Sequence, residues 1–336
     1  MREQFYYGHG KLLLTGEYFI LDGAHSVALP TNLGQTLSVK YERSKNPMLK
    51  WKSFDSTGKC WFEATYDLWH FNCIDNDSEE AIILKKILTE ARSQNVHFLR
   101  DEVDVVVETR LEFPLGWGLG SSSTLIYNIA QWAYVSPFDL LQKTFGGSGY
   151  DIACAQSLGP ITYEVKGTGP RWETCEFNPH FRENIYFVYL NRKQNTRESI
   201  TRYKELVIDK KLKKEIIGKI DEISSSMLKC VDFKEFEDLV FDHENIISHA
   251  LDMPRIKDTK FTDFWGSIKS LGAWGGDFAM VTSDRSMEET KLYFKNQGFN
   301  QILSFDELIL QRPERVLGTS SHNQAFGESN IHATLN

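Results

Sequence analysis

Three glycines alternate with other residues just before a run of serines near the middle of the sequence. The segment reads Pro114-Leu115-Gly116-Trp117-Gly118-Leu119-Gly120-Ser121-Ser122-Ser123-Thr124. Because glycine has no Cβ, its backbone can turn tightly and approach a ligand closely. The serines begin a predicted helix, where unpaired amides and the helix dipole favour an anion. The segment therefore predicts a phosphate-binding loop, with a serine-capped strand–helix connection as the alternative.

Three further glycine-rich segments carry side chains that could act on a phosphate or on the group that receives it. Gly8-His9-Gly10-Lys11 is followed shortly by Gly16-Glu17-Tyr18, and Asp151 follows directly after Gly149-Tyr150. The segment Leu271–Phe278 holds three glycines at the start of a predicted strand. Any one of these segments could be a simple turn. Together, with a lysine, a carboxylate and a serine run, they favour a ligand-binding site.

Other common nucleotide-binding and metal-binding motifs are not completed in this sequence. A P-loop requires serine or threonine after Gly10-Lys11, where Leu12 stands, and a G-x-G-x-x-G fingerprint requires glycine where Ser121 stands. Neither a G-x-S-x-G nucleophile elbow nor the H-R-D loop of protein kinases occurs. His243 and His249 are six residues apart, which would not place them on one helical face as metal ligands. We therefore interpret both histidines as ordinary helix residues.

Hydrophobic periodicity predicts the elements that would position these segments. Strands are expected at residues 11–14, 18–21, 27–30, 36–41, 103–109, 185–190 and 276–282. Helices are expected at residues 80–93, 124–134, 197–207, 212–228 and 233–251, and Ser286-Met287-Glu288-Glu289 provides a capping box for another helix. The serine-rich loop would thus connect a strand to a buried helix. Strands and helices in both halves indicate an α+β or α/β class.

The length of the chain and its irregular stretches suggest two domains. The chain has 336 residues, and a domain commonly holds roughly 100–200 residues. The stretch from Lys166 to Asn184 contains two glycines and two prolines and has no clear helical period. We place the domain boundary near its end, which gives domains of residues 1–183 and 184–336. Residues beyond Leu317 are polar and unpatterned, so we expect a loose tail there.

Composition excludes several classes of protein. Hydrophobic residues make up 41% of the chain, and the net charge of −8 offers no general basic surface for a nucleic acid. No stretch approaches the roughly 18 apolar residues of a spanning helix, and Lys11 and Glu17 interrupt the apolar run that a secretory signal needs. The five cysteines are scattered without a C-x-x-C pair, which is typical of reduced thiols. We therefore expect a cytoplasmic protein that binds neither nucleic acid nor membrane.

Taken together, the glycine-rich segments resemble the motifs of the GHMP kinase superfamily, whose members phosphorylate small-molecule alcohols and related groups with ATP. The first motif resembles Gly10–Tyr18, the second and most diagnostic resembles Pro114–Ser123, and the third resembles Leu271–Phe278. The motifs follow the family's order, so the resemblance covers nearly the whole chain. Gly149-Tyr150-Asp151-Ile152-Ala153 is similar to the G-Y-D-I-A signature of a bacterial subgroup.

The resemblance implies an α+β, two-domain GHMP kinase fold. An N-terminal domain of the ribosomal protein S5 domain 2-like type would face a ferredoxin-like C-terminal domain, with ATP and substrate in the cleft between them. ATP and Mg²⁺ are the implied cofactors, and a small-molecule alcohol is the implied partner. The chain would act as a monomer or a homodimer.

The resemblance also implies a role for each motif residue. Asp151 would take the proton from the attacking hydroxyl or orient it, and Lys11 would pair with Asp151 and help neutralise the substrate oxygen. The loop amides would cradle the phosphates, as charge neutralisation and positioning are the main needs of phosphoryl transfer. Ser122 would ligate Mg²⁺. The expected ATP-binding residues are Pro114, Gly116, Gly118, Leu119, Gly120, Ser121, Ser122 and Ser123.

Residues at the acceptor end are also implied by the resemblance. Glu17 and Tyr18 stand where relatives contact substrate, and Asn195-Thr196-Arg197 resembles a segment that mevalonate kinases place near substrate. Thr196 and Arg197 could bind a substrate carboxylate, which the planar fork of arginine matches well. A solvated arginine at a helix start is the alternative.

Two departures from the family pattern stand out. The stretch Ser136–Gln142 lacks the magnesium-binding glutamate that mevalonate kinases carry before the Asp151 loop, although Asp139 lies nearby. Magnesium could then rest on Ser122, phosphates and water. Trp274 and Asp277 stand where the third motif usually has glycines, and they could narrow the cleft or change how the loop backbone approaches it.

The favoured hypothesis is an ATP-dependent small-molecule kinase, most like a mevalonate kinase of isoprenoid biosynthesis. A phosphomevalonate kinase is the alternative within the class, and its second anionic group would need some of Arg192, Lys193, Arg197 and Arg202. A catalytically degenerate member that senses a nucleotide or metabolite is the alternative from another class. The missing glutamate favours the sensor, whereas Lys11, Ser122 and Asp151 favour the enzyme.

Overall fold

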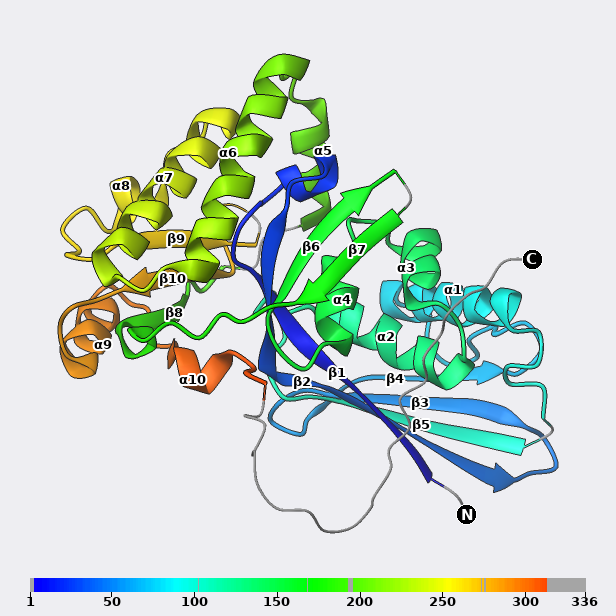
Figure 1. Ribbon diagram of the computed structural model, residues 1–336. Coiled ribbons are helices and arrows are strands. Elements are labelled where there is room, and N and C mark those ends of the chain that lie inside the picture. Colours follow the sequence, from blue (N-terminus) through cyan, green and yellow to red (C-terminus); the bar gives the residue numbers. More distant parts are fainter. Residues whose placement is uncertain are drawn as a thin grey trace, which may run out of the picture.

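Two β-sheets organise the part of the chain that the structure describes. The computed structural model describes residues 3–101, 103–167, 169–192, 196–272, 274 and 276–312. Within these residues, seven strands form one mixed sheet and four strands form a second, antiparallel sheet. β1 and β2 run through the middle of the molecule, between two groups of helices (Figure 1). No helix of the described ranges is long and apolar enough to cross a membrane.

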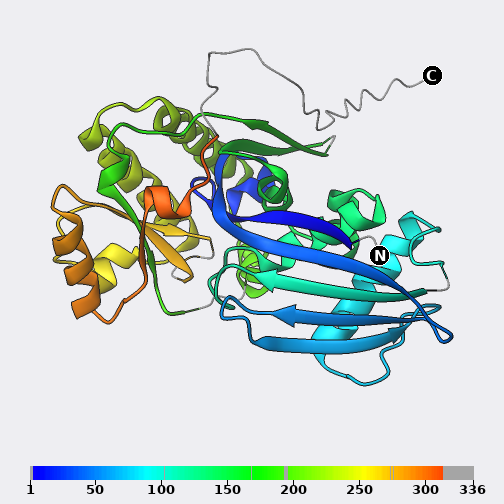
Figure 2. The same ribbon diagram turned by 90° about the horizontal axis from the view of Figure 1, so that it is seen from below.

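The larger sheet is built around one long strand. β2 (Ser26–Arg43) pairs antiparallel with β1 (Glu3–Leu13), β5 (Val103–Leu111) and β6 (Ile161–Lys166). The strand order is β4-β3-β5-β2-β6-β7, and β1 lies off this path beside β2. The other strands are β3 (Met48–Phe54), which runs parallel to β5, β4 (Cys60–Asp67) and β7 (Gly169–Thr174). Figure 2 shows this sheet from below, with the smaller sheet and its helices on the left.

Helices from the N-terminal half pack against one face of the larger sheet. They are α1 (Glu79–Gln94), α2 (Ser121–Ala133), α3 (Pro137–Thr144) and α4 (Tyr150–Gln156). Serine hydroxyls cap two of them, because Ser78 accepts the amide of Ala81 and Ser136 accepts the amide of Asp139. Glycines in the left-handed conformation precede α2 and α4 instead. The two helices that begin at glycine-rich segments therefore keep their first turns free of a side-chain cap.

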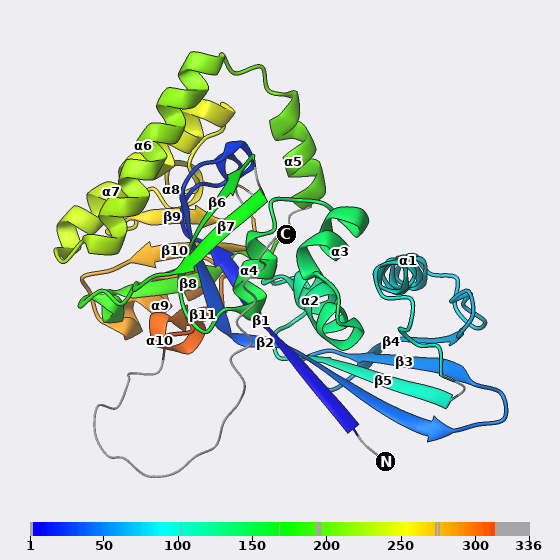
Figure 3. The same cartoon turned by 45° about the vertical axis from the view of Figure 1, so that its right-hand side comes forward.

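The smaller sheet is covered on both faces. Its strands are β8 (Ile185–Tyr189), β9 (Ile268–Leu271), β10 (Phe278–Thr282) and β11 (Ile302–Ser304), in the order β11-β8-β10-β9. The helices of this half are α5 (Thr196–Glu205), α6 (Lys210–Lys229), α7 (Phe233–Leu251), α8 (Ile256–Lys260), α9 (Met287–Asn296) and α10 (Phe305–Leu308). Phe187 packs in a cluster with α6 and α7, whereas Val188 packs in a cluster with α8 and α9. Burial on both faces explains why β8 is a continuous apolar run. Figure 3 shows α6 and α7 side by side.

One hydrophobic cluster joins the two sheets. It combines Leu12 and Leu29 from the larger sheet with Phe187, Leu271 and Phe278 from the smaller one. The segments that carry the first and third glycine-rich motifs thus contribute to the same core. This shared core fixes the position of those motifs relative to each other.

The structure confirms the α+β class and the predicted helices. The predicted helices at 80–93, 124–134, 197–207, 212–228 and 233–251 correspond to α1, α2, α5, α6 and α7. The capping box of Ser286 and Glu289 is present at the start of α9. The predicted domain boundary after residue 183 falls between β7, the last strand of the larger sheet, and β8, the first of the smaller sheet.

Three predictions about strands and loops were wrong. Residues 18–21 are not a strand, because Phe19–Asp22 forms a 3₁₀ helix. The predicted strands 27–30 and 36–41 are one strand, β2, which continues through Gly34. A Cβ on Gly34 would lie 2.3 Å from the carbonyl oxygen of Gly8, so this glycine permits a close strand approach rather than a turn. The stretch predicted as irregular, from Lys166, contains β7. The predicted tail beyond Leu317 lies outside the described residues.

Candidate active site

The serine-rich loop connects β5 to α2, as the sequence predicts. Gly116, Gly118 and Gly120 have φ angles of +95°, +70° and +91°, a backbone region that residues with a Cβ rarely adopt. Gly120 precedes α2 without a side-chain cap, and Ser122 in the first turn is exposed. Ser123 turns inward, where its hydroxyl donates to the carbonyl of Gly120 at 2.8 Å. The first-turn amides of α2 are therefore available to an anion.

Both the backbone and the side chain of Lys11 contact this loop. Its amide donates to the carbonyl of Leu119 at 3.0 Å. A Cβ on Gly120 would lie 3.1 Å from Cγ of Lys11 and 2.7 Å from Oγ of Ser123, so a side chain at position 120 would displace both. A Cβ on Gly10 would lie 3.0 Å from the carbonyl oxygen of Leu119. Glycine at both positions lets the first and second motifs touch through their backbones.

The structure brings Lys11 and Asp151 together at this loop. The ammonium group of Lys11 lies 5.7 Å from the ring centre of Tyr150, the residue before Asp151. One carboxylate oxygen of Asp151 accepts the amide of Ile152 at 3.0 Å, and the hydroxyl of Ser123 lies close enough to oppose the rise in its pKa. Lys11 and Asp151 both remain partly exposed. A ligand at the loop could therefore reach both side chains.

Burial controls the protonation of Asp151. Burial raises the pKa of its carboxyl group, and Lys11 opposes this change without cancelling it. The desolvated carboxylate of Asp151 is therefore a stronger base than a carboxylate in water. Burial works against the charge of Lys11, but Tyr150, Asp277 and Asp151 together raise its pKa, so it stays cationic.

The third motif reaches the same loop through Asp277. A Cβ on Gly118 would lie 2.3 Å from Cγ of Asp277 and 2.4 Å from one of its carboxylate oxygens. Asp277 is 5% exposed and has a φ angle of +53°. Its amide donates to the carbonyl of Arg192, and its own carbonyl accepts the amide of Leu190, both at 2.8 Å. The departure from glycine at this position thus places a carboxylate directly against the serine-rich loop.

The oxygen donors near the loop fit a magnesium ion that is also held by phosphate oxygens. Among the described residues, no group of three or more His, Cys, Asp or Glu side chains could hold a metal ion. Ser122 is exposed at the loop, the carboxylate of Asp277 lies against Gly118, and the carboxylate of Asp151 lies near Ser123. These groups fit a cation that also binds phosphate oxygens. Asp139 lies exposed in the first turn of α3. This placement does not support a magnesium-binding role for Asp139.

A cavity of about 340 Å³ lies at the predicted acceptor end. Tyr18 and Trp274 both line it, and the hydroxyl of Tyr18 accepts the amide of Trp274 at 3.0 Å. The first and third motifs therefore meet here as well. Tyr18 also stacks on Tyr203, with ring centres 5.4 Å apart. The cavity is lined by Tyr18, Arg192, Ser199, Arg202, Tyr203, Leu206, Leu251, Met253, Pro254, Ile256, Thr259, Lys260 and Trp274.

Among the described residues that line this cavity, the charged ones are all basic. They are Arg192, Arg202 and Lys260, and this described lining contains neither aspartate nor glutamate. Thr196 and Arg197 begin α5, the helix that also provides Ser199, Arg202 and Tyr203 to the cavity. The side chains of Thr196 and Arg197, and the whole of Lys193 and Asn195, lie outside what the structure describes. The cavity would suit a ligand that has an apolar part and at least one anionic group.

The structure places Glu17 in a buried cluster of ionisable side chains rather than in this cavity. Its carboxylate lies 2.5 Å from the ammonium group of Lys269 on β9, which also lies 3.4 Å from Glu244 on α7. Nε2 of His243 accepts the amide of Gly16 at 3.1 Å. Glu17 and Glu244 are 1% exposed, and Lys269 and His243 are 0% exposed. The predicted contact between Glu17 and substrate is therefore not supported, and His243 is more than an ordinary helix residue.

This buried cluster holds two carboxylates for one ammonium group. Burial raises the pKa of Glu244 to about 7 and also raises the pKa of Glu17, with Lys269 opposing both changes. Burial lowers the pKa of His243 well below its usual value, so the imidazole is neutral. Oε2 of each glutamate and Nδ1 of His243 have no hydrogen-bond partner within the described structure. With Glu244 protonated, one carboxylate faces one ammonium group and the cluster carries no excess charge.

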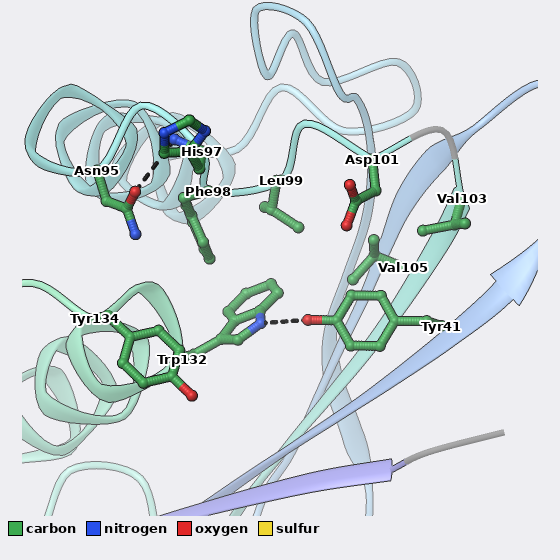
Figure 4. A pocket seen from close by; sticks show the side chains of 10 residues that line it. All are labelled: Tyr41, Asn95, His97, Phe98, Leu99, Asp101, Val103, Val105, Trp132 and Tyr134. Atoms are coloured by element: carbon green, nitrogen blue, oxygen red, sulfur yellow. Dashed lines mark hydrogen bonds between the residues drawn. The ribbon is translucent and has the colours of Figure 1, made fainter.

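A second, smaller cavity lies at the other end of the molecule (Figure 4). Its volume is about 180 Å³, and it is lined by residues between β2, β5 and the ends of α1 and α2. The indole of Trp132 donates to the hydroxyl of Tyr41 at 2.9 Å, and Phe98 packs edge-on against Trp132. The polar groups of Tyr41 and Trp132 are thus already hydrogen-bonded to each other. None of the four glycine-rich segments contributes to this cavity.

The geometry of the loops and sheets is that of the GHMP kinase fold. The solved structures similar to this chain include mevalonate kinases, phosphomevalonate kinases, a galactokinase and a mevalonate diphosphate decarboxylase. Neither a protein-family model nor a curated protein sequence matches the chain. The likeness is therefore one of fold.

Three of these structures define the likeness more closely. The Methanococcus jannaschii mevalonate kinase has a TM-score of 0.67 at 16% identity and covers 92% of this chain and 99% of its own. The L. major mevalonate kinase in complex with R-mevalonate has a TM-score of 0.65 at 12% identity, covering 92% and 96%. The Streptococcus pneumoniae phosphomevalonate kinase with phosphomevalonate and AMPPNP has a TM-score of 0.63 at 13% identity, covering 90% and 99%. The chain is similar to these kinases over nearly its whole length.

Proposed function

We propose that the protein is an ATP-dependent kinase that transfers the γ-phosphate to the hydroxyl group of a small molecule. The observation that carries this proposal is the position of Lys11 and Asp151 beside the serine-rich loop. A phosphate-binding loop, a cation and a desolvated carboxylate are the parts that phosphoryl transfer to an alcohol needs. The GHMP kinase fold supports the same assignment.

Each residue then has a defined part in the reaction. The loop amides and the start of α2 bind the phosphates, and Lys11 stabilises the charge on the acceptor oxygen and the transferred group. Asp151 accepts the hydroxyl proton as the alcohol oxygen forms its bond to the γ-phosphorus, while the bond to the ADP oxygen breaks. Mg²⁺, held by phosphate oxygens with Ser122 and the neighbouring carboxylates, would supply further charge neutralisation.

The cavity at Tyr18 and Trp274 supports an anionic acceptor. Its three cations and apolar wall would fit a hydroxy acid such as mevalonate, which is bound in the similar L. major kinase. The same cations favour a phosphorylated acceptor as a second candidate, as in the similar S. pneumoniae kinase that binds phosphomevalonate. Arg192, Arg202 and Lys260 provide enough charge for a carboxylate and a phosphate together.

A nucleotide- or metabolite-sensing protein of the same fold is the second candidate function. Asp277 favours it, because a carboxylate packed against Gly118 adds negative charge where phosphate would bind. The retained Lys11 and Asp151 favour the kinase.

An assay of ADP release distinguishes the kinase from the sensor. The full chain is assayed with ATP and Mg²⁺ against mevalonate, phosphomevalonate, galactose and homoserine, with Asp151→Asn as the control for background ATP hydrolysis. We expect acceptor-dependent ADP release with one of the two anionic alcohols, mevalonate or phosphomevalonate. ATP binding without acceptor-dependent release from any of the four compounds would favour the sensor.

A further inference from the structure

Hydrogen bonds fix the walls of the smaller cavity, the one drawn in Figure 4. Arg92 is 8% exposed, and its guanidinium donates to the carbonyl oxygens of Phe98 and Leu99 at 3.0 and 2.8 Å. Leu99 is held at a φ angle of +56°, a region that residues with a Cβ rarely adopt. The side-chain amide of Asn95 donates to the carbonyl of Ala133 at 2.7 Å, which ties the end of α1 to the end of α2. The cavity therefore has a preformed shape.

Aromatic rings make up much of the cavity wall. Two tyrosines, a phenylalanine and a tryptophan are among the described residues that line it, namely Tyr41, Tyr134, Phe98 and Trp132. The indole N–H of Trp132 is used by the hydroxyl of Tyr41, and this hydroxyl in turn lies 3.3 Å from Oε1 of Gln4. A ligand in the cavity would therefore meet Tyr41 and Trp132 through their rings, and the π face of an aromatic ring attracts a cation.

A carboxylate gives this cavity the opposite charge to the acceptor cavity. Asp101 is exposed, and Figure 4 shows its side chain above the ring of Tyr41. Burial raises the pKa of the Tyr41 hydroxyl, and the nearby charge of Asp101 adds to this rise. The described lining contains neither lysine nor arginine, and His97 is its one side chain that becomes cationic on protonation. The described charged residues of the acceptor cavity, in contrast, are basic.

We propose that the cavity lined by Phe98, Trp132 and Asp101 is a binding site for a small organic ammonium ion. Such an ion is attracted both to aromatic faces and to a carboxylate, and its carbon groups fit an apolar wall. The cavity, of about 180 Å³, has room for a trimethylammonium group with a short carbon chain. None of the four glycine-rich segments contributes to the described lining, so this site is additional to the proposed kinase site.

A matched pair of ligands and three variants separate the effect of charge from that of shape. Choline and its neutral isostere 3,3-dimethylbutan-1-ol have similar shapes, but only choline is a cation. Asp101→Asn removes the carboxylate at an exposed position, which should leave the fold intact. Trp132→Phe keeps an aromatic ring but offers a weaker π face to a cation. Asp139→Asn, which removes an exposed carboxylate of α3 outside the described lining, is the matched control.

Calorimetric titration of the full chain with each of the two ligands tests the proposal. For the native chain and Asp139→Asn we expect choline to bind at least about tenfold more tightly than the neutral isostere. This preference should fall by at least about threefold in Asp101→Asn and in Trp132→Phe. If Trp132→Phe does not fold, Asp101→Asn decides alone.

Equal affinity of the native chain for the two ligands, or binding of neither, would overturn the proposal. A preference that a folded cavity variant leaves unchanged, or that Asp139→Asn reduces equally, would overturn it as well. The titration does not involve ATP or an acceptor, so its failure would leave the proposed kinase function standing.

Discussion

The ammonium group of Lys269 lies 2.5 Å from the carboxylate of Glu17, although the two residues are 252 positions apart in the sequence. Glu17 immediately precedes Tyr18, which lines the candidate acceptor cavity, and Lys269 lies on β9, which leads into the third motif. The pair therefore connects the first motif to the strand before the third. Both side chains are buried, so this connection is not screened by solvent.

Removal of the ammonium group should therefore destabilise the protein strongly. In Lys269→Met, Glu17 and Glu244 lose their common cation, and breaking a buried pair typically costs about 3–5 kcal/mol. Lys213→Met is the control, because Lys213 forms a partly exposed pair with Asp22 at 3.0 Å, which is worth about 0–1 kcal/mol. Guanidinium-induced unfolding at pH 7 measures both losses. Equal losses in the two variants would contradict a structural role of the buried pair.

The raised pKa of Glu244 predicts how stability changes with pH. The folded chain holds the proton up to about pH 7, whereas the unfolded chain releases it near 4.5. The contribution of this proton is therefore complete below the unfolded pKa and is lost as the pH rises through the folded pKa. Glu244→Gln removes the titration, so its stability relative to the native chain should increase by up to about 3 kcal/mol between pH 4.5 and pH 8.

The native chain must be compared with Glu244→Gln because the titration of His243 changes the stability in the opposite direction. Its folded pKa lies well below the usual value, so the unfolded chain gains a proton below about pH 6.5 and stability falls with acid. This loss is present in both the native chain and Glu244→Gln, and it cancels in the difference between them. A pH-independent difference would show that Glu244 is ionised throughout.

The sequence predicts the serine-rich loop at the centre of the candidate site because local residue patterns determine the strand and the helix that flank it. The serine-rich loop lies between a strand with β-branched residues and a helix with a clear apolar face, and both elements formed as predicted. The glycines of the loop also have positive φ angles, as their spacing suggested. The presence of a glycine in the sequence does not by itself show which structural role it has, however. Gly34 lies between the strands predicted at residues 27–30 and 36–41, whereas in the structure it allows β1 and β2 to approach each other within one continuous strand pairing.

The buried cluster was missed because its members come from three distant segments. Lys269 lies in a short strand whose four residues are all buried, and His243 continues the helical spacing of Val240 and Ile247 on the buried face of α7. A charged residue within an apolar pattern was the available signal, but the pattern does not identify its partner. The inward position of Asp277 was equally hidden, since it depends on how β10 and the serine-rich loop pack against each other.

Asp151→Asn tests the proposed base directly. The amide cannot accept the hydroxyl proton, so acceptor-dependent turnover should fall by roughly 10²–10⁴-fold while ATP affinity is largely kept. Asp139→Asn is the matched control, because Asp139 is an exposed carboxylate on the neighbouring helix α3. Steady-state ADP release and nucleotide titration give the two readouts. Near-normal turnover of Asp151→Asn would remove Asp151 from the mechanism.

Arg202→Gln tests whether the basic cavity binds the acceptor. Arg202 lines the cavity next to Tyr18 and Tyr203, and no residue of the serine-rich loop is among the described residues that line it. Its loss should therefore weaken binding of the acceptor and leave binding of the nucleotide unaffected. A lost charge-assisted hydrogen bond is worth about 1.5–3 kcal/mol, which predicts a KM for the acceptor raised by roughly 10–100-fold. Arg43→Gln, an exposed arginine at the end of β2, is the control. An increase in the KM for ATP with an unchanged KM for the acceptor would place the acceptor elsewhere.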